Sequence, residues 1–234
     1  MIYDPVDRAS EARRRLELWI AFLKLSFATH NSTSIGMLSE LLGSACLATM
    51  AEVESFVRDL VESLVEEINA CGRPIKDLRP TIRVLAAHTQ FDSIKSMGLK
   101  NNKFWETRVA VTTLDVSDVI ASLPVRSSRC PQPPLRGATI RPAQITEVAK
   151  IFGFPEPFSF MGQYNGSSLP VSLQKVAEYR NDFAHGGISS SELFSDPIDD
   201  VDEVVRHIGN IARFLDEVAD GWKNVVSKRS YLRN

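Results

Sequence analysis

The chain has few of the features that define several protein classes. Its 234 residues contain only three cysteines, Cys46, Cys71 and Cys130, and none stands in a C-x-x-C pair. This odd number and spacing argue against a disulfide framework and against a zinc ribbon. Chains without disulfides are typical of reducing compartments, and the N-terminal residues lack the apolar core of a secretory signal. We therefore expect a cytoplasmic protein.

Long apolar runs and an excess of one charge are also missing. The best candidate for a membrane span, residues 18–28, is short and is interrupted by Lys24, so a spanning helix is not expected. The 27 Lys and Arg residues nearly balance 29 Asp and Glu residues, which gives a net charge of −2. A broadly basic nucleic-acid binder is excluded by this balance. Any nucleic acid must therefore be bound at a local site.

Helical periodicity is the strongest pattern that is present. Apolar residues recur at three- and four-residue spacing through most of the chain, and strict alternation is not found, which predicts an all-α fold. The clearest element is a long second helix over residues 34–70, which has no proline and ends before Gly72 and Pro74. Further helices are predicted over residues 10–29, 80–97, 144–152, 171–185 and 197–227, with a broken one over 101–123.

The sequence also predicts where two of these helices begin and where one long loop lies. Ser10 is the expected N-cap of the first helix, and Asp196 with Pro197 is the expected start of the last. Residues 124–142 are too rich in proline, serine and glycine to form regular structure. The composition does not shift across this loop, so we expect a single all-α domain over residues 1–234 with a Pro-rich insertion.

The candidate catalytic residues lie near the end of the helix predicted over 171–185. We call Arg180, Asn181 and His185 the Arg-Asn-His motif. On a helix Arg180 and His185 lie roughly 140° apart, whereas Asn181 and His185 share a face, so the amide could orient the imidazole. Gly186 and the glycine after it predict the helix end, which places His185 in the last turn beside the negative end of the helix dipole.

This combination suits cleavage of RNA without a metal ion. A neutral histidine can accept the proton of a ribose 2′-OH, a charged one can protonate the leaving 5′-oxygen, and a guanidinium can bind the growing phosphate charge. The expected products carry a 2′,3′-cyclic phosphate and a 5′-OH, and DNA lacks the required nucleophile. Because one chain has one such histidine, a second copy across a two-fold axis could supply both acid and base.

The spacing alone is not specific. Arg83 and His88 have the same separation, but they lie within a predicted helix among apolar residues, so we interpret them as structural. Arg180 and Asn181 could also serve as a helix cap and a surface ion pair. Asp182 is more easily explained as a solvated residue than a catalytic one, and Glu54 of the long helix could support the site or simply be exposed.

Residues 180–186 resemble the Arg-polar-x3-His signature of HEPN domains, especially the bacterial RiboL-PSP-HEPN-like subgroup. The long helix with Glu54 before Phe56, and the short helix before Gly153, are similar to that family as well. The resemblance implies an all-α, usually dimeric bundle without cofactors. It also implies that Arg180 and His185 are catalytic, with Asn181 as polar helper, whereas possible support from Glu54 or Asp182 is a prediction from the residues alone.

Two functions are compatible with the resemblance. Many HEPN domains are metal-independent endoribonucleases of toxin–antitoxin or antiphage systems, which implies RNA, a second copy and an antitoxin or defence-system partner. Others are non-catalytic adaptors or nucleotide-binding modules. HEPN toxins that are silenced by adenylylation have a tyrosine two residues after the histidine, and Gly187 stands there in this chain, so that control is not supported.

Overall fold

The computed structural model describes residues 4–29, 35–97, 103–125, 135, 139–154, 168–186 and 188–233. Over these residues the regular structure is helical, and the extended pairing is limited to two isolated bridges, Pro74 with Ile120 and Leu78 with Leu232. The prediction of an all-α fold with a long second helix is confirmed.

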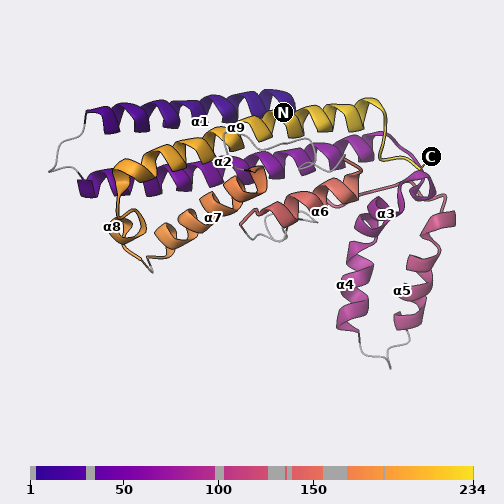
Figure 1. Ribbon diagram of the computed structural model, residues 1–234. Helices are drawn as coiled ribbons and strands as arrows, with labels where there is room; N and C mark the ends of the chain where they lie inside the picture. The colour runs from indigo at the N-terminus through magenta and orange to yellow at the C-terminus, as the bar shows by residue number, and fades with distance from the viewer. Residues whose placement is uncertain are drawn as a thin grey trace.

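Four long helices form the body of the molecule (Figure 1). They are α1 (Pro5–Ala28), α2 (Ile35–Ala70), α7 (Leu169–His185) and α9 (Pro197–Ser227). Helices α2 and α9 pack against each other, and both α1 and α7 contact this pair. In Figure 1 α1 lies above the pair and α7 below it, so these two helices occupy opposite sides of the body.

Burial follows the apolar periodicity of the two central helices. Because α2 is covered by helices on several sides, its apolar stripe is buried along nearly the whole length, and α9 contributes the facing stripe. The buried residues of α2 include Leu38, Leu42, Ala45, Val53, Phe56, Leu60, Leu64 and Ile68, and those of α9 include Val204, Ile208, Ile211, Phe214 and Leu215.

The helix starts show which of the predicted caps form. Helix α1 begins earlier than predicted, because Asp4 is its N-cap and accepts the backbone N–H of Val6 at 2.9 Å, with Pro5 in the first turn. The prediction of Ser10 as N-cap is wrong, and Ser10 is an exposed residue inside the helix. The prediction for α9 is confirmed, since the Asp196 side chain accepts the N–H of Asp199.

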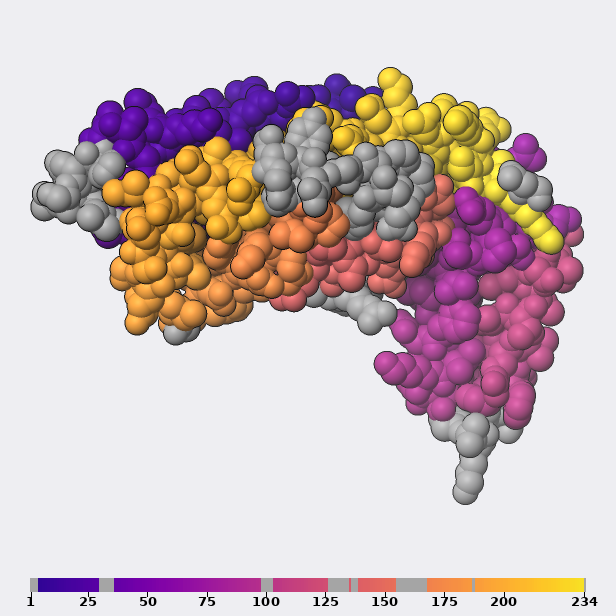
Figure 2. All heavy atoms as spheres, in the orientation of Figure 1, coloured from indigo at the N-terminus to yellow at the C-terminus, as the bar shows by residue number. Residues whose placement is uncertain are grey.

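A small helical arm projects from one end of the body (Figures 1 and 2). It contains α3 (Pro80–Ala86), α4 (His88–Ser96) and α5 (Lys103–Thr112). The prediction of one helix over residues 80–97 is wrong, because the helix is interrupted at Ala87, whose ψ of 10° is not helical. Helix α3 buries Ile82 and Leu85, whereas α4 contributes no buried residue, so the two parts follow different packing constraints.

The remaining elements are short. The 3₁₀ helices η2 (Ile75–Asp77) and η3 (Leu114–Val116) join the arm to the body, α6 (Pro142–Phe152) packs near α2 and α7, and α8 (Ser190–Leu193) precedes α9. Much of the predicted Pro-rich loop, including residues 126–134 and 136–138, lies outside the described residues. Leu135 and Ile140 within it are buried. The assignment of residues 1–234 to one domain stays a prediction.

Candidate functional site

Helix α7 carries the Arg-Asn-His motif and ends where the sequence predicts. Gly186 follows the helix in the left-handed conformation, with φ 63°, which a glycine adopts without strain. His185 is therefore the last helical residue, beside the negative end of the helix dipole, and its side chain is exposed. Arg180 and Asn181 lie about one turn earlier and are half-buried.

The guanidinium of Arg180 is held by two side chains. Its Nη1 donates to Oδ1 of Asn181 at 3.0 Å and approaches Oγ1 of Thr139 at 3.5 Å, the longer being the weaker contact. Thr139 belongs to the segment that leads into α6. The arginine is thus fixed between α7 and this segment, with donors left over that could bind a phosphate oxygen.

Asn181 contacts the arginine of the motif and not the histidine. In the part of the chain that the structure describes, no hydrogen bond joins the Asn181 amide to the His185 ring, although the two residues are four positions apart. The neighbouring guanidinium competes for the amide oxygen, because its charged donor makes the stronger hydrogen bond. A catalytic part for Asn181 stays a prediction, and the geometry indicates that it would act by positioning Arg180.

A close contact ties the end of α7 to α2. Gly43 of α2 faces the ring of Phe183, and a Cβ at this position would lie 2.3 Å from Cδ2 of that ring. Such a distance is far below van der Waals contact, so the approach requires the glycine. Phe183 lies between Asn181 and His185 in the sequence. Its contact with Gly43 therefore sets how closely this part of α7 packs against α2.

A polar cluster between α7 and α9 was not anticipated from the sequence. It consists of Ser172 and Tyr179 on α7 with Glu203, His207 and Asn210 on α9. Tyr179 donates to Oε1 of Glu203 at 3.2 Å, and Nε2 of His207 lies 3.3 Å from the same oxygen. Nδ1 of His207 is 3.0 Å from Oγ of Ser172, which also accepts from the Asn210 amide at 2.8 Å.

The electrostatics of this cluster favour a neutral histidine. Burial lowers the pKa of His207, and this effect exceeds the raising effect of Glu203. Because a carboxylate only accepts, Nε2 of the neutral ring carries the hydrogen and Nδ1 accepts from Ser172. Burial, with Glu203 nearby, raises the pKa of Tyr179 to about 12. The cluster therefore joins α7 to α9 through hydrogen bonds from uncharged donors. Its member Tyr179 directly precedes Arg180 in the sequence.

A sequence signal for this cluster does exist. Glu203 and His207 are four residues apart in α9, and that spacing places them on one helix face. The signal is weak, because it does not say that the face is buried or that Tyr179 and Ser172 oppose it.

The other residues singled out from the sequence lie apart from the motif contacts. Glu54 lies in the middle of α2, where its Oε2 accepts from Arg58 at 3.2 Å and its side chain is only 15% exposed. Asp182 is exposed. Arg83 is buried, and its Nε donates to the carbonyl oxygen of Leu78 at 3.0 Å, which agrees with the structural interpretation. His88 begins α4 and is half-buried.

No group of three or more His, Cys, Asp or Glu side chains within the described ranges is arranged to share a metal ion. Among the helices that these residues form, none has both the length and the apolar character to cross a bilayer.

The chain matches a known protein family. The family model described as MAE_28990-like HEPN matches residues 12–231, which is nearly the whole chain and includes all of the Arg-Asn-His motif. Neither the curated proteins nor the solved structures include a match to this chain.

Proposed function

We propose that this chain, which belongs to the HEPN superfamily by its match over residues 12–231, is a metal-independent endoribonuclease of a bacterial toxin–antitoxin or antiphage defence system. HEPN domains often bind RNA and dimerise. The matched family has a different description from the RiboL-PSP-HEPN subgroup, so membership of that subgroup stays a prediction.

The observation that supports cleavage best is the arrangement of Arg180 and His185 on one helix end. The guanidinium is oriented by Asn181, while the imidazole stands exposed in the last turn of α7. A preoriented cation can stabilise charge that develops on the non-bridging phosphate oxygens. An exposed imidazole can reach the ribose 2′-OH or the leaving 5′-oxygen of a bound strand.

A second copy of the chain completes this proposal. General acid-base cleavage uses one group to accept a proton and another to donate one, and each protomer has one motif histidine. A two-fold axis close to the C-terminal end of α7 would bring two copies of His185 to one phosphodiester. Under this arrangement the site is composite, and the monomer is inactive.

The test is an RNA cleavage assay with purified protein in EDTA. The proposal expects cleavage of RNA and not of DNA of the same sequence, with 2′,3′-cyclic phosphate and 5′-OH ends. An RNA carrying one 2′-deoxynucleotide at the cut site should resist cleavage there, because the attacking hydroxyl is missing. Cleavage of the deoxy-substituted bond at the normal rate would contradict the mechanism.

The biological setting has its own test. A toxin or abortive defence ribonuclease arrests growth when it is expressed without its antitoxin or defence-system partner. We expect induction of the wild-type chain in a bacterial host to arrest growth, and His185→Ala to relieve the arrest at equal protein level. Equal growth arrest by both proteins would speak against RNA cleavage as the cause.

A second candidate function, a non-catalytic adaptor, is supported by an exposed apolar face on α1. Leu18, Phe22 and Leu25 are 58%, 48% and 65% exposed at helical spacing, and Leu47 of α2 is 40% exposed. Contiguous exposed apolar surface of this kind is typical of protein interfaces. Helix α1 lies on the side of the body opposite to α7 (Figure 1), so a partner bound through this face of α1 is not expected to use Arg180 or His185.

A further inference from the structure

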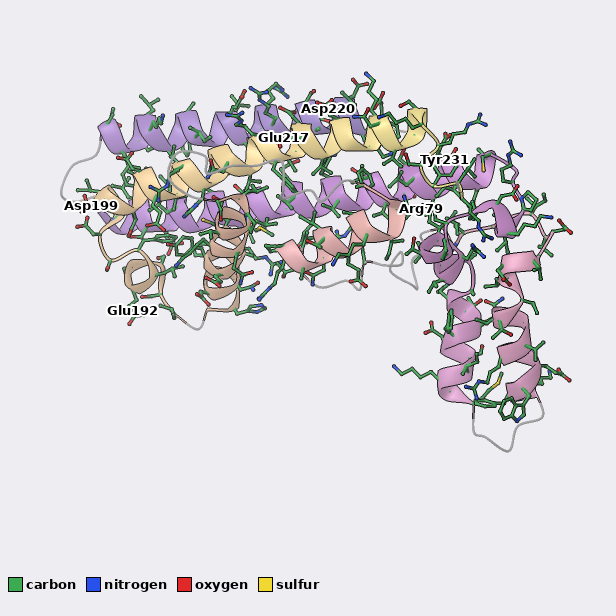
Figure 3. The ribbon with its side chains drawn as sticks, turned by 45° about the vertical axis from the view of Figure 1, so that its right-hand side comes forward. Arg79, Glu192, Asp199, Glu217, Asp220 and Tyr231 are labelled. Atoms are coloured by element: carbon green, nitrogen blue, oxygen red, sulfur yellow. The ribbon has the colours of Figure 1, made fainter. Side chains whose placement is uncertain are left out.

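The chain around the Arg-Asn-His motif carries a strong negative charge. Residues 181–203 contain seven Asp or Glu residues and neither Lys nor Arg. Figure 3 shows two of these acids, Glu192 and Asp199, at the end of the body opposite to the arm. Because like charges repel, this end attracts a phosphate backbone poorly. An RNA substrate therefore needs part of its binding energy from another surface of the molecule.

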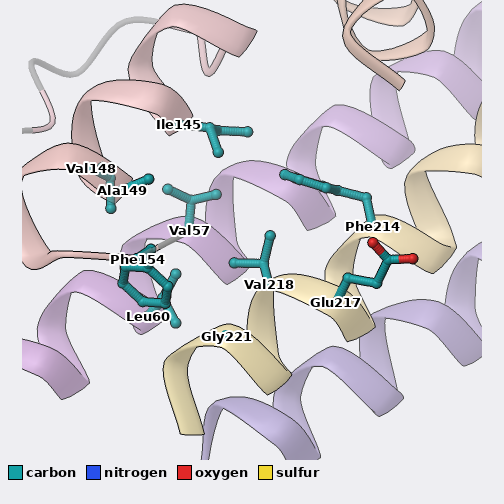
Figure 4. A pocket seen from close by; sticks show the side chains of 10 residues that line it. All are labelled: Val57, Leu60, Ile145, Val148, Ala149, Phe154, Phe214, Glu217, Val218 and Gly221. Carbon is teal, nitrogen blue, oxygen red and sulfur yellow. The ribbon is translucent and has the colours of Figure 1, made fainter. Parts of the chain in front are cut away.

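The pocket between α2, α6 and α9 is too small to supply that energy (Figure 4). Apolar side chains such as Val57, Ile145 and Phe214 line it, and its volume is about 30 Å³. Such a volume holds roughly one or two water molecules. A nucleobase is much larger than this, so it cannot enter the pocket.

Helices α4 and α5 of the arm bury few of their own side chains. The two helices contact each other, and their other main contacts are with the short elements α3 and η3. Helix α4 has no buried residue along its described length, and α5 buries Phe104. Short helices gain most of their stability from packing of an apolar face. The apolar side chains of this hairpin thus remain largely accessible to a ligand.

Two aromatic rings on the arm are open to solvent. Phe91 of α4 is 40% exposed, and Trp105 of α5 is 62% exposed. The guanidinium carbon of Arg108, one turn after Trp105, lies 5.1 Å from the centroid of the indole and 5.2 Å from that of Phe104. These contacts hold the indole in place and still leave more than half of it accessible.

The charges around these rings nearly cancel. Lys95, Lys103 and Arg108 are exposed on α4 and α5, and so are Asp92 and Glu106. An excess of one positive charge gives only a weak attraction for phosphates. A nucleic acid bound at this surface would therefore depend on stacking of its bases on the rings, an interaction that every base can make.

We propose that the arm binds single-stranded RNA, with unpaired bases stacked on Trp105 and Phe91 and with Arg108 beside the phosphates. Stacking removes the exposed rings from water, and the guanidinium adds a charge-assisted contact. The arm and α7 project on the same side of the body in Figures 1 and 3, so one strand can extend from the arm toward the motif. This inference rests on the proposed function, because it takes RNA as the ligand.

Other partners fit this surface less well. The base faces of a nucleic-acid duplex are hidden within its own stack, so they are not available to the rings. A protein partner would bury Lys95, Lys103, Asp92 and Glu106 together with the rings, and charged residues are depleted at the cores of protein interfaces.

The experiment measures binding of a fluorescein-labelled single-stranded RNA to the full chain by fluorescence anisotropy. The RNA carries 2′-O-methyl groups, which block the attacking hydroxyl, so binding is measured without cleavage. We expect saturable binding of the single strand, at least about tenfold tighter than binding of a duplex of the same sequence, because only the single strand offers unpaired bases.

Variants connect this preference to the indole. Trp105→Ala should weaken binding of the single strand roughly 5- to 150-fold, the range found when a stacking aromatic is removed. Trp105→Phe should retain most of the affinity, since a phenyl ring also stacks. Phe22→Ala removes an exposed aromatic ring from α1, so it is the matched control and should leave the affinity unchanged.

The salt dependence separates stacking from charge. Arg108→Gln should reduce the slope of log K against log salt concentration by about 0.7, the value for one phosphate contact with a single strand. Trp105→Ala should leave this slope unchanged, because the indole neutralises no phosphate. A slope that stays the same in Arg108→Gln would contradict the place given to this guanidinium.

Tryptophan fluorescence gives a second readout that does not depend on the affinity of a variant. Trp105 is exposed, whereas Trp19 and Trp222 are half-buried. Unlabelled single-stranded RNA should quench the fluorescence of the wild-type chain, because a stacked base contacts the indole directly. Trp105→Phe should lose most of this quenching while it still binds the strand.

Three results would each overturn the proposal. They are equal affinity for single strand and duplex, unchanged affinity in Trp105→Ala, and equal quenching in the wild type and Trp105→Phe. Sedimentation identifies the competing partner class, since altered self-association of Trp105→Ala at unchanged RNA affinity would make the arm a protein interface.

Failure of this proposal is distinguishable from failure of the proposed function. Binding of RNA through the arm without cleavage of ordinary RNA would exclude the ribonuclease and support the arm as an RNA-binding surface. Cleavage of RNA with an unchanged KM in Trp105→Ala would exclude RNA binding by the arm and leave the ribonuclease in place.

Discussion

Nη1 of Arg180 donates a hydrogen bond to Oδ1 of Asn181, its neighbour in the sequence, over 3.0 Å. The polar residue of the motif therefore orients the arginine, whereas the sequence spacing suggested that it orients the histidine. This contact gives Asn181 a physical role that can be separated from acid-base chemistry.

The first prediction concerns Asn181→Ala. Loss of this hydrogen bond to a charged donor should slow RNA cleavage roughly 10- to 100-fold through looser placement of Arg180. Asp182→Ala, at the next position and exposed, should stay within about twofold of wild type, as is usual for surface changes. Single-turnover cleavage rates test both variants. Equal losses in the two variants would indicate a general effect on α7 and contradict the positioning role.

The second prediction concerns the contact between Gly43 and Phe183. In Gly43→Ala the new methyl group would overlap the Phe183 ring, so the free energy of unfolding should fall by about 1–3 kcal/mol, as in overpacked cores. Gly36→Ala in the same helix is the matched control. A Cβ at Gly36 meets no atom within 4 Å, so this variant should be neutral or up to about 1 kcal/mol more stable. Urea denaturation measures both, and a reversed order would refute the close approach.

The third prediction concerns pH and His207. Burial lowers the pKa of His207 below its ordinary value of 6.5, so the unfolded chain binds the proton more readily. The stability contribution is therefore complete above pH 6.5 and is lost as the pH falls through 6.5 toward the lowered value. A single group can change the free energy of unfolding by at most about 1.4 kcal/mol per pH unit.

The measurement compares the wild-type chain with His207→Gln. Urea denaturation between pH 7.5 and 5.5 should show a smaller loss of stability for the variant than for the wild type, because the titrating group is gone. The same pH dependence in both proteins would mean that His207 does not titrate differently on folding.

The fourth prediction separates the two candidate functions. Phe22→Glu puts a charge in the exposed apolar face of α1, on the opposite side of the body from α7. The ribonuclease account expects cleavage within about twofold of wild type, since the change is remote from the motif. The adaptor account expects loss of self-association, because a charge in an apolar interface is not solvated. Sedimentation and cleavage are measured on the same samples, with Phe22→Leu as control.

The sequence was informative where periodicity and local chemistry decide the structure. The buried stripe of α2 and the Asp196 cap of α9 follow from apolar spacing and from the N-cap preference, and both are present. The early start of α1 was missed, although Asp4 and Pro5 form the same N-cap and first-turn pair as Asp196 and Pro197 at the start of α9. The end of α7 at Gly186 was predicted for the correct reason, the left-handed conformation.

The parts that the sequence did not predict depend on contacts between distant segments. The break at Ala87 arises because α3 packs on the body while α4 leaves it. The cluster of Tyr179, Glu203 and His207 requires α7 and α9 to face each other. Single-helix patterns carry no information on such pairings.

The central claim is that Arg180 and His185 cleave RNA, and one comparison tests it most directly. Cleavage of an RNA substrate in EDTA is measured for the wild type, Arg180→Ala, His185→Ala and His88→Ala. His88 has the same spacing from Arg83 and is the matched control. We predict rate losses of about 10²–10⁴ for the two motif variants and an unchanged rate for His88→Ala. Cleavage at the wild-type rate by His185→Ala would contradict the account.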